Sequence, residues 1–149
     1  MRNPEKVVFM NMCMVYDDNK VLVIDRQKKD WPGITFPGGH VELGESFTDS
    51  VIREIKEETN LDIQNPMLCG IKDWSENGIR YALLFYKTNK FSGEIVSSDE
   101  GEVWWEDIDN LPNLKLALDM VAMLRVFLED ELSEFFYYQK DNKWVYDLK

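Results

Sequence analysis

Three glutamates, Glu54, Glu57 and Glu58, lie close together near the middle of the chain. Their spacing of i, i+3 and i+4 would place the three carboxylates on one face of a helix with about 3.6 residues per turn. Like charges at this spacing destabilise an isolated helix, so solvent or a hard cation has to compensate them. The cluster could therefore hold a divalent cation through oxygen ligands, although on spacing alone a solvated helix face is the commoner explanation.

A helix predicted from Ser46 to Asn60 would carry these acids. Its apolar stripe consists of Phe47, Val51 and Ile55, spaced four apart, with Ile52 beside them. Ser46 can cap the first turn, with Asp49 as a shorter form of the reciprocal acid of a capping box. Asn60 tolerates the left-handed conformation that ends many helices, so both ends of the helix are signalled.

The other elements follow from hydrophobic periodicity and turn residues. We expect strands over 6–16, 20–25, 61–74, 79–88 and 102–106, a structured loop over 26–44 and a second helix over 114–130. Tight turns are expected at 17–19, at Asn77-Gly78 and, within a hairpin formed by the aromatic C-terminal tail, at Asp141-Asn142. That tail, if ordered, could cover a sheet edge, cap a cleft or meet a second subunit, and the last arrangement would make a homodimer.

Length and composition narrow the class of protein. The 149 residues are about one domain's worth, so we expect a single domain over 1–149. A net charge of −11 disfavours duplex nucleic acid but allows a small phosphorylated ligand whose charge divalent cations neutralise. Cys13, Cys69 and the single histidine, His40, cannot complete a zinc site, and two thiols outside a CxxC arrangement fit a cytoplasmic setting. No apolar run approaches the roughly 18–20 residues that cross a bilayer, so no membrane partner is expected.

A longer motif surrounds the three glutamates. From residue 38 the chain reads GGHVELGESFTDSVIREIKEETNL, which resembles the box of the Nudix hydrolases: Gly, five residues, Glu, seven residues, Arg-Glu-aliphatic-x-Glu-Glu-x-Gly-aliphatic. Eight of the nine defined positions match, namely Gly39, Glu45, Arg53, Glu54, Ile55, Glu57, Glu58 and Leu61. The exception is Asn60, where the family usually has glycine. Asparagine is the next most tolerant residue for a left-handed helix cap, so the departure is mild.

The resemblance implies an α/β/α sandwich with a mixed β-sheet, and metal-dependent hydrolysis of a phosphoanhydride with Mg²⁺ or Mn²⁺. Glu57 and Glu58 would be metal ligands, together with the backbone carbonyl of Gly38. Glu54 would be a further ligand or the general base that activates water. Oxygen donors of this kind suit hard divalent cations.

Further residues would support or complete this site. By the resemblance, Glu45 would orient Glu54, and Arg53 would pair with a carboxylate of the box, which is in part the role of a plain structural ion pair. Many relatives recruit one more acid from outside the box, and Glu100 in the segment DEGE is the first candidate. A solubilising polar loop explains that segment equally well. His40 is expected to be a loop residue near the phosphates and not a catalytic group.

The substrate is a separate question, because the rest of the fold chooses the group attached to the diphosphate. The approach WPGITFPGGHVE and the segment SSDEGEVWW resemble bacterial MutT-type members that act as 8-oxo-dGTP diphosphatases. This implies hydrolysis of a purine nucleoside triphosphate to the monophosphate and pyrophosphate. A base needs a flat apolar wall and a few polar groups, for which the candidates are Asn11, Trp31, Phe36 and either Trp74 or Tyr81. Aromatic residues of a small domain are more often simply part of its core.

Two alternatives remain open. The first is a diphosphatase for another nucleotide derivative, such as a nucleoside diphosphate sugar or a capped RNA end, of which RNA is disfavoured by the charge of −11. The second is a sensor that binds a nucleotide without cleaving it. Loss of acids from the box would mark a sensor, and this chain retains all of them.

Overall fold

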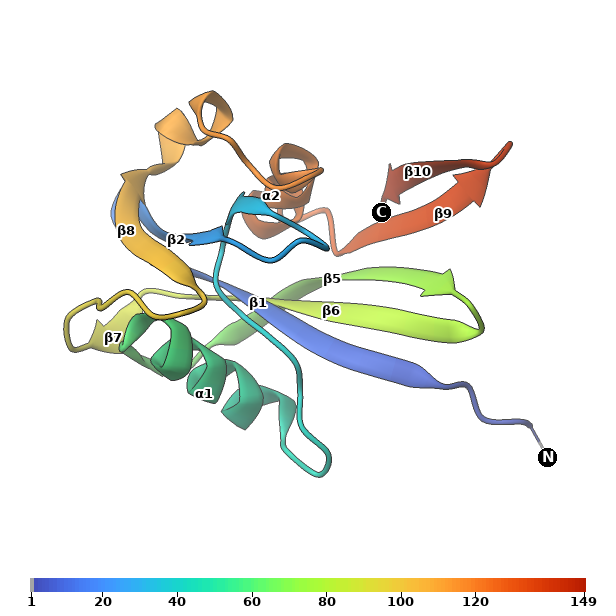
Figure 1. Cartoon of the computed structure of the whole chain (residues 1–149), viewed down its shortest axis with the longest axis horizontal. Coiled ribbons are helices and arrows are strands. Elements are labelled where there is room, and N and C mark those ends of the chain that lie inside the picture. Colours follow the sequence, from blue (N-terminus) through green and yellow to red (C-terminus); the bar gives the residue numbers. More distant parts are fainter. Residues whose placement is uncertain (1) are drawn as a thin grey trace.

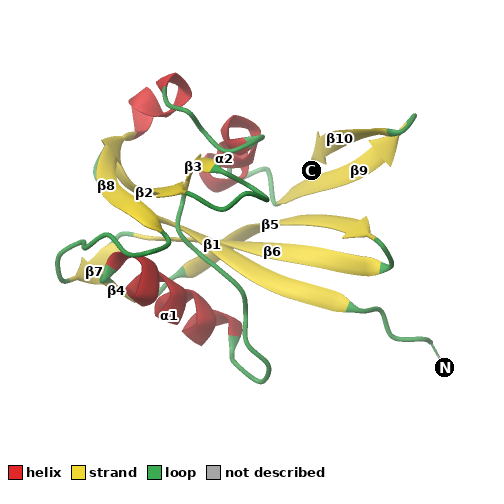
Figure 2. Cartoon of the chain, viewed as in Figure 1, coloured by secondary structure: helices red, strands yellow, loops and turns green. Residues whose placement is uncertain are grey.

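A computed structural model describes residues 2–149 (Figures 1 and 2). The strands over this range are β1 (Val7–Asp17), β2 (Lys20–Arg26), β3 (Gly33–Thr35), β4 (Asp62–Gln64), β5 (Met67–Glu76), β6 (Ile79–Thr88), β7 (Lys90–Ser92), β8 (Gly101–Asp107), β9 (Glu134–Lys140) and β10 (Lys143–Leu148). The helices are α1 (Phe47–Thr59) and α2 (Met120–Leu128), and a 3₁₀ helix covers Ile108–Asn113. Among the described residues, neither α-helix is long and apolar enough to span a membrane.

The main sheet mixes parallel and antiparallel pairs. Its strand order is β10-β9-β5-β6-β1-β2-β3, with β8 on the other side of β2. β1 runs parallel to β6 from Val7 to Val15, whereas it pairs with β2 only through Tyr16 and Asp17. The hairpin expected over 6–16 and 20–25 is therefore paired only next to its turn, after which the two strands diverge into different parts of a curled sheet (Figure 1).

Both faces of the sheet are buried, because successive side chains of the central strands enter two different cores. One core contains Met12, Met14, Val21, Val23, Leu83 and Phe85, which pack with Met123 and Phe127 of α2. The other contains Cys13, Val15, Leu22, Ile24, Leu84 and Tyr86, which pack with Val51 and Ile55 of α1. Figure 1 shows the two helices on opposite sides of the strands. This is the predicted α/β/α sandwich with a mixed sheet.

The acid-bearing helix α1 begins and ends as predicted. The backbone N–H of Asp49 donates a hydrogen bond to the Ser46 hydroxyl at 3.0 Å. At the other end Asn60 has φ 71°, in the left-handed region, and its backbone N–H donates to the carbonyl of Lys56. Local sequence signals determine this element, so its position could be predicted without knowledge of the fold.

The second helix is shorter than the predicted 114–130, because residues 115–117 form backbone pairs with β3. The N–H of Ile34 donates to the carbonyl of Lys115 at 3.0 Å, and the N–H of Ala117 donates to the carbonyl of Ile34 at 2.9 Å. The chain then turns at Asp119, with φ 64°, before α2 begins. Tertiary pairing thus overrides the helical periodicity of this segment.

The strand predicted over 61–74 is also divided. Asn65 has φ 50°, which breaks the extended conformation. The part before it, β4, pairs with β7 in a separate two-stranded sheet, whereas β5 joins the main sheet beside β6. The turns expected at Asn77-Gly78 and at Asp141-Asn142 both have positive φ at their two central residues, as tight hairpins require.

Candidate active site

The glycine loop that precedes α1 is attached along β1. The N–H of Asn11 donates to the carbonyl of Gly39 at 2.8 Å, and the N–H of Cys13 donates to the carbonyl of Pro37 at 2.9 Å. A Cβ atom on Gly38 would lie 2.1 Å from the backbone oxygen of Asn11. Glycine is therefore the residue type that permits this close approach of loop and strand.

The side chain of Asn11 joins the same loop to α1. Its Oδ1 accepts a hydrogen bond from the N–H of Gly39 at 3.1 Å, and its Nδ2 donates to the Ser50 hydroxyl at 2.9 Å. Only 2% of Asn11 is exposed. The amide that the sequence suggested as a base contact is thus already bonded within the protein, and any part it has in substrate binding would act through the position of the loop.

Glu58 is the most deeply buried acid of the box, at 2% exposure. Its Oε1 accepts a hydrogen bond from the N–H of Gly38 at 2.7 Å, and its Oε2 lies 3.7 Å from the Arg26 guanidinium. Burial raises the pKa of Glu58 from 4.5 to about 7, with the neighbouring charges of Glu54 and Glu100 adding to the effect. The Gly38 N–H and Arg26 only partly offset it. The ionised form of Glu58 is therefore disfavoured, because it is buried, lies near other acids and has no full counter-charge.

Glu54 lies directly against the glycine turn. A Cβ on Gly39 would lie 2.3 Å from its carboxyl carbon, so the absence of a side chain at Gly39 leaves room for this carboxylate. Burial raises the pKa of Glu54, Arg53 lowers it, and the charges of Glu57 and Glu100 raise it further. A carboxyl group with a raised pKa is a stronger base than an ordinary carboxylate.

Arg53 connects the acids on the outer side of the helix. Its guanidinium donates to both oxygens of Glu45, at 2.7 and 3.0 Å, to Glu54 at 3.0 Å and to Glu57 at 3.2 Å. It also donates to the backbone carbonyl of His40 at 3.1 Å. These bonds lower the pKa of Glu45 to about 2, with the Arg53 contact as the largest cause. Arg53 therefore links Glu45 to Glu54 and fixes the helix against the loop.

Glu57 and Glu100 are the more exposed acids of this group. The Glu57 side chain is 59% exposed, and its only hydrogen bond among residues 2–149 comes from Arg53. Glu100 is paired with Lys28 at 3.0 Å. Its charge nevertheless acts on both Glu54 and Glu58, which places the DEGE segment beside the box.

The donor set suits a hard divalent cation. Within residues 2–149, no three acid, histidine or cysteine side chains converge closely enough to enclose an ion in this arrangement. Glu54 and Glu58 nevertheless have raised pKa values, because burial and mutual repulsion leave their negative charge undercompensated. A cation among oxygen donors would relieve that repulsion, so the residues present fit such an ion.

A cavity of about 520 Å³ extends from this site to a group of aromatic rings. Its charged end is lined by Arg26, Lys28, Gly38, Gly39 and His40. Its aromatic end is lined by Trp31, Trp74, Tyr81, Tyr137 and Trp144. One cavity thus joins a surface suited to phosphates to a surface suited to a flat apolar group.

The candidate base contacts all line this cavity, in different ways. Trp31 is half-buried in its wall, and Trp74 stacks on Tyr81 with ring centroids 5.1 Å apart. Phe36, in contrast, is 1% exposed and packs edge-on against Phe127 of the core. Phe36 therefore forms the floor of the cavity more than its wall.

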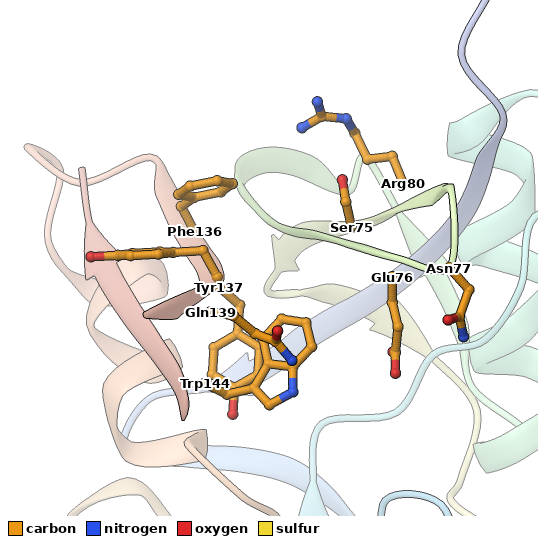
Figure 3. A pocket seen from close by; sticks show the side chains of 9 residues that line it. Ser75, Glu76, Asn77, Arg80, Phe136, Tyr137, Gln139 and Trp144 are labelled. Carbon is orange, nitrogen blue, oxygen red and sulfur yellow. The ribbon is translucent and has the colours of Figure 1, made fainter. Parts of the chain in front are cut away.

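Sequence reasoning missed several residues of the cavity, notably Arg26, Lys28, Lys72, Asp119 and the rings of the C-terminal hairpin. No signal in the local sequence singles out Lys72, which stands between Ile71 and Asp73 in a strand of mixed polarity. Of the three roles considered for the hairpin, the structure shows two: β9 pairs with β5 and so covers that edge of the sheet, and Tyr137 and Trp144 border the cleft. Figure 3 shows Tyr137 and Trp144 beside a second hollow of about 400 Å³, which Glu76 also lines. Their stacked rings, 5.0 Å apart, line both hollows.

Comparison with known proteins agrees with this geometry. Residues 10–127 match the NUDIX domain. The chain is 37% identical over 111 residues to the Nudix hydrolase YvcI of Bacillus subtilis, covering 70% of this chain and 69% of the relative. It is 33% identical over 120 residues to an ADP-ribose pyrophosphatase of Methanocaldococcus jannaschii, covering 77% of this chain and 69% of the relative.

A solved structure gives the same result for nearly the whole chain. The crystal structure of the mutator MutT protein from Bacillus halodurans superposes with a TM-score of 0.78 and 28% identity, covering 95% of this chain and 97% of that protein. The fold of this chain, the residues of its box and the matched domain thus all indicate the same family. The chain therefore belongs to the Nudix hydrolase family.

Proposed function

We propose that this protein hydrolyses a purine nucleoside triphosphate, 8-oxo-dGTP in particular, to the nucleoside monophosphate and pyrophosphate. The observation that carries the proposal is the continuous cavity, which has basic side chains and the glycine turn of the acid-bearing box at one end and stacked rings at the other. A nucleoside triphosphate has the same division into a polyanion and a flat base. Removal of an oxidised nucleotide before a polymerase uses it would be the biological role, and the similarity to a MutT structure supports it.

Nudix hydrolases act with divalent cations, and here Mg²⁺ or Mn²⁺ would be held by Glu57, Glu58, Glu54 and the carbonyl of Gly38. The bound ion would neutralise the phosphoryl oxygens as charge develops on them. Arg26 and Lys28 line the same end of the cavity and can bind phosphate oxygens directly.

The remaining residues of the box position or deprotonate water. Glu54 has a raised pKa and lies against the glycine turn, so it is suited to accept a proton from the attacking water. Arg53 bonds to both Glu54 and Glu45, and Glu45 holds that guanidinium in place through two contacts. Glu45 and Arg53 thus act as positioning residues, while Glu100 would add an acid from outside the box.

A second candidate is hydrolysis of a nucleoside diphosphate derivative. It is favoured by the 33% identity to an ADP-ribose pyrophosphatase. The same acids and the same ring-lined cavity could bind such a substrate. A non-catalytic sensor is the third candidate. It is disfavoured because this chain retains all the acids of the box, which a sensor would not need.

The test is product analysis with Mg²⁺ on four substrates: 8-oxo-dGTP, dGTP, ADP-ribose and a dinucleoside polyphosphate. Preferential release of pyrophosphate from 8-oxo-dGTP, absent in Glu58→Gln, is the expected result. Activity confined to ADP-ribose or the dinucleoside polyphosphate would replace the proposal with the second candidate. Tight binding without turnover on any of the four would favour the sensor.

A further inference from the structure

Lys72 is a buried cation in the wall of the cavity. It lies on β5 between Leu83 of β6 and Phe135 of β9, and it is 9% exposed. Its only hydrogen bond among residues 2–149 is to the sulfur of Met123, at 3.8 Å. An ammonium group has three donors, and a thioether is a weak acceptor, so the donors of Lys72 are largely unused.

Aromatic rings surround this ammonium. The Nζ atom lies 5.4 Å from the ring centroid of Trp31, 5.3 Å from that of Trp74, 5.4 Å from that of Phe135 and 5.5 Å from that of Tyr137. Ring faces attract a cation but do not accept its N–H groups as an oxygen does. Asp119 and Glu76 are carboxylates of the same cavity, and Asp119 acts on the charge of Lys72, but no carboxylate of the described residues forms an ion pair with it.

The residues around Lys72 limit the kind of group that could bind to it. The phosphates of a nucleotide belong at the other end, beside Arg26 and Lys28. A further anion among the rings would meet the carboxylate of Asp119 and lose its hydration, so the acceptor is a neutral oxygen. The ring-lined walls call for a flat group, and a purine that carries a ring carbonyl meets both conditions. Guanine has the acceptor O6 on its edge, where adenine has an amino donor.

We propose that Lys72 determines base specificity in this cavity by donating a hydrogen bond from Nζ to the ring carbonyl of a 6-oxopurine. The inference rests on the proposed function and deepens it, because it assigns the choice between guanine-type and adenine-type nucleotides to one residue. An adenine-type base would place an amino donor, instead of a carbonyl acceptor, opposite the buried ammonium. A site built around such a donor rejects the analogue that cannot bond to it.

The test is binding, measured separately from turnover. The probes are dGMP and dAMP in the presence of Mg²⁺, and the readouts are calorimetry and quenching of the cavity tryptophans. The variants are Lys72→Met, which keeps the length and apolar stem, and Lys72→Gln, which keeps a neutral donor. Lys87→Met is the matched control, because Lys87 is a partly buried lysine of β6 that donates to the Phe127 carbonyl outside the cavity.

We expect the wild-type protein to bind dGMP about ten- to a hundredfold more tightly than dAMP, the range of a hydrogen bond from a charged donor. Lys72→Met should lose that preference by weakening dGMP alone, Lys72→Gln should retain part of it, and Lys87→Met should behave as the wild type. Three results would overturn the proposal. Lys72→Met could weaken the binding of dGMP and dAMP equally, it could keep the preference for dGMP, or the wild-type protein could show no preference at all.

These outcomes are separable from those of the hydrolysis assay. A guanine preference that depends on Lys72 in a protein that cleaves no nucleoside triphosphate would remove the proposed function and keep the specificity assignment. Hydrolysis of 8-oxo-dGTP that is equally selective in the wild type and in Lys72→Met would do the reverse. Thermal melting of each variant shows whether a loss of binding comes from a loss of fold.

Discussion

The two ends of the cavity are built in different ways. At the acid end, the glycine turn and the neighbouring box acids come from one stretch of 21 residues, 38–58, whose members bond to one another, and Arg26 and Lys28 add two cations from outside it. The aromatic end takes its rings from the segment before β3, from β5, from β6 and from the C-terminal hairpin. Hydrolytic chemistry is thus encoded locally, whereas the walls that contact the rest of the substrate depend on the whole fold. Changes at the acid end should affect turnover of every substrate, and changes at the aromatic end should affect the choice of substrate.

The largest effect is expected for Glu58→Gln. The amide keeps an oxygen for the Gly38 N–H but removes the charge that a divalent cation needs, so turnover should fall by several orders of magnitude for all substrates. Glu54→Gln should behave similarly, because it removes the proposed base. Steady-state kinetics on 8-oxo-dGTP and ADP-ribose would measure both. Rates close to wild type in both variants would contradict the site assignment.

Glu58→Gln should also change how the stability of the protein depends on pH when no cation is present. The folded pKa of Glu58 is about 7, against 4.5 for an ordinary glutamate, so between these values the folded state binds more protons than the unfolded state. Stability should therefore fall as the pH rises from about 4.5 to 7, by on the order of 3 kcal/mol at about 1.4 kcal/mol per pKa unit. Urea unfolding in EDTA should show a steeper slope in the wild type than in Glu58→Gln, which keeps the smaller contribution of the raised pKa of Glu54. An identical slope in both proteins would assign it to another group.

Arg53→Lys should have an intermediate effect. Lysine keeps the charge but cannot reach Glu45, Glu54 and the His40 carbonyl at once, so kcat/KM should fall about 10- to 100-fold, as for loss of a partner that orients a metal ligand. The matched control is Arg125→Lys, since Arg125 forms two bonds to Glu129 on the surface, away from the cavity. Equal losses in the two variants would indicate a general effect on stability.

The contrast between the two ends also explains what could be predicted from the sequence. The helix α1, its cap at Ser46 and its end at Asn60 depend on residues within a few positions of one another, and they lie where predicted. The α/β/α arrangement was predictable because the resemblance covers most of the chain. The proximity of the box acids could be argued from helical spacing alone.

The rest depends on contacts between distant residues. Residues 115–117 have a helical pattern but pair with Ile34, more than 80 positions earlier. Lys72 and Tyr137 meet because β5 and β9 run side by side, and nothing near either residue in the chain indicates that pairing. Propensity and periodicity carry no information on such contacts, so the aromatic end could be proposed only as a set of candidate rings.

Trp144→Leu is expected to have a smaller effect, at the aromatic end. Trp144 lines the cavity and stacks on Tyr137 at 5.0 Å, so its loss should raise KM about two- to tenfold with kcat nearly unchanged. Tyr146→Leu is the control on the same strand, because Tyr146 stacks on Phe135 outside the cavity lining. If kcat fell as much as KM rose, the hairpin would also be needed for the acid end, and the division of roles between the two ends would fail.

The smallest effect is expected for Asn60→Gly, which restores the usual residue of the box. Glycine adopts the left-handed φ of 71° without steric cost, but the change removes the bond from Nδ2 to the Glu94 carbonyl at 3.0 Å and loosens the unfolded chain. A hydrogen bond of this kind contributes about 0.5–1.5 kcal/mol, close to what glycine gains, so the free energy of unfolding should change by less than about 0.5 kcal/mol. Urea midpoints at a common m-value would measure the change, with turnover unaltered. A loss above about 1 kcal/mol would mean that the bond to Glu94 holds the end of the acid-bearing helix, and that asparagine here is a specific replacement for the missing glycine.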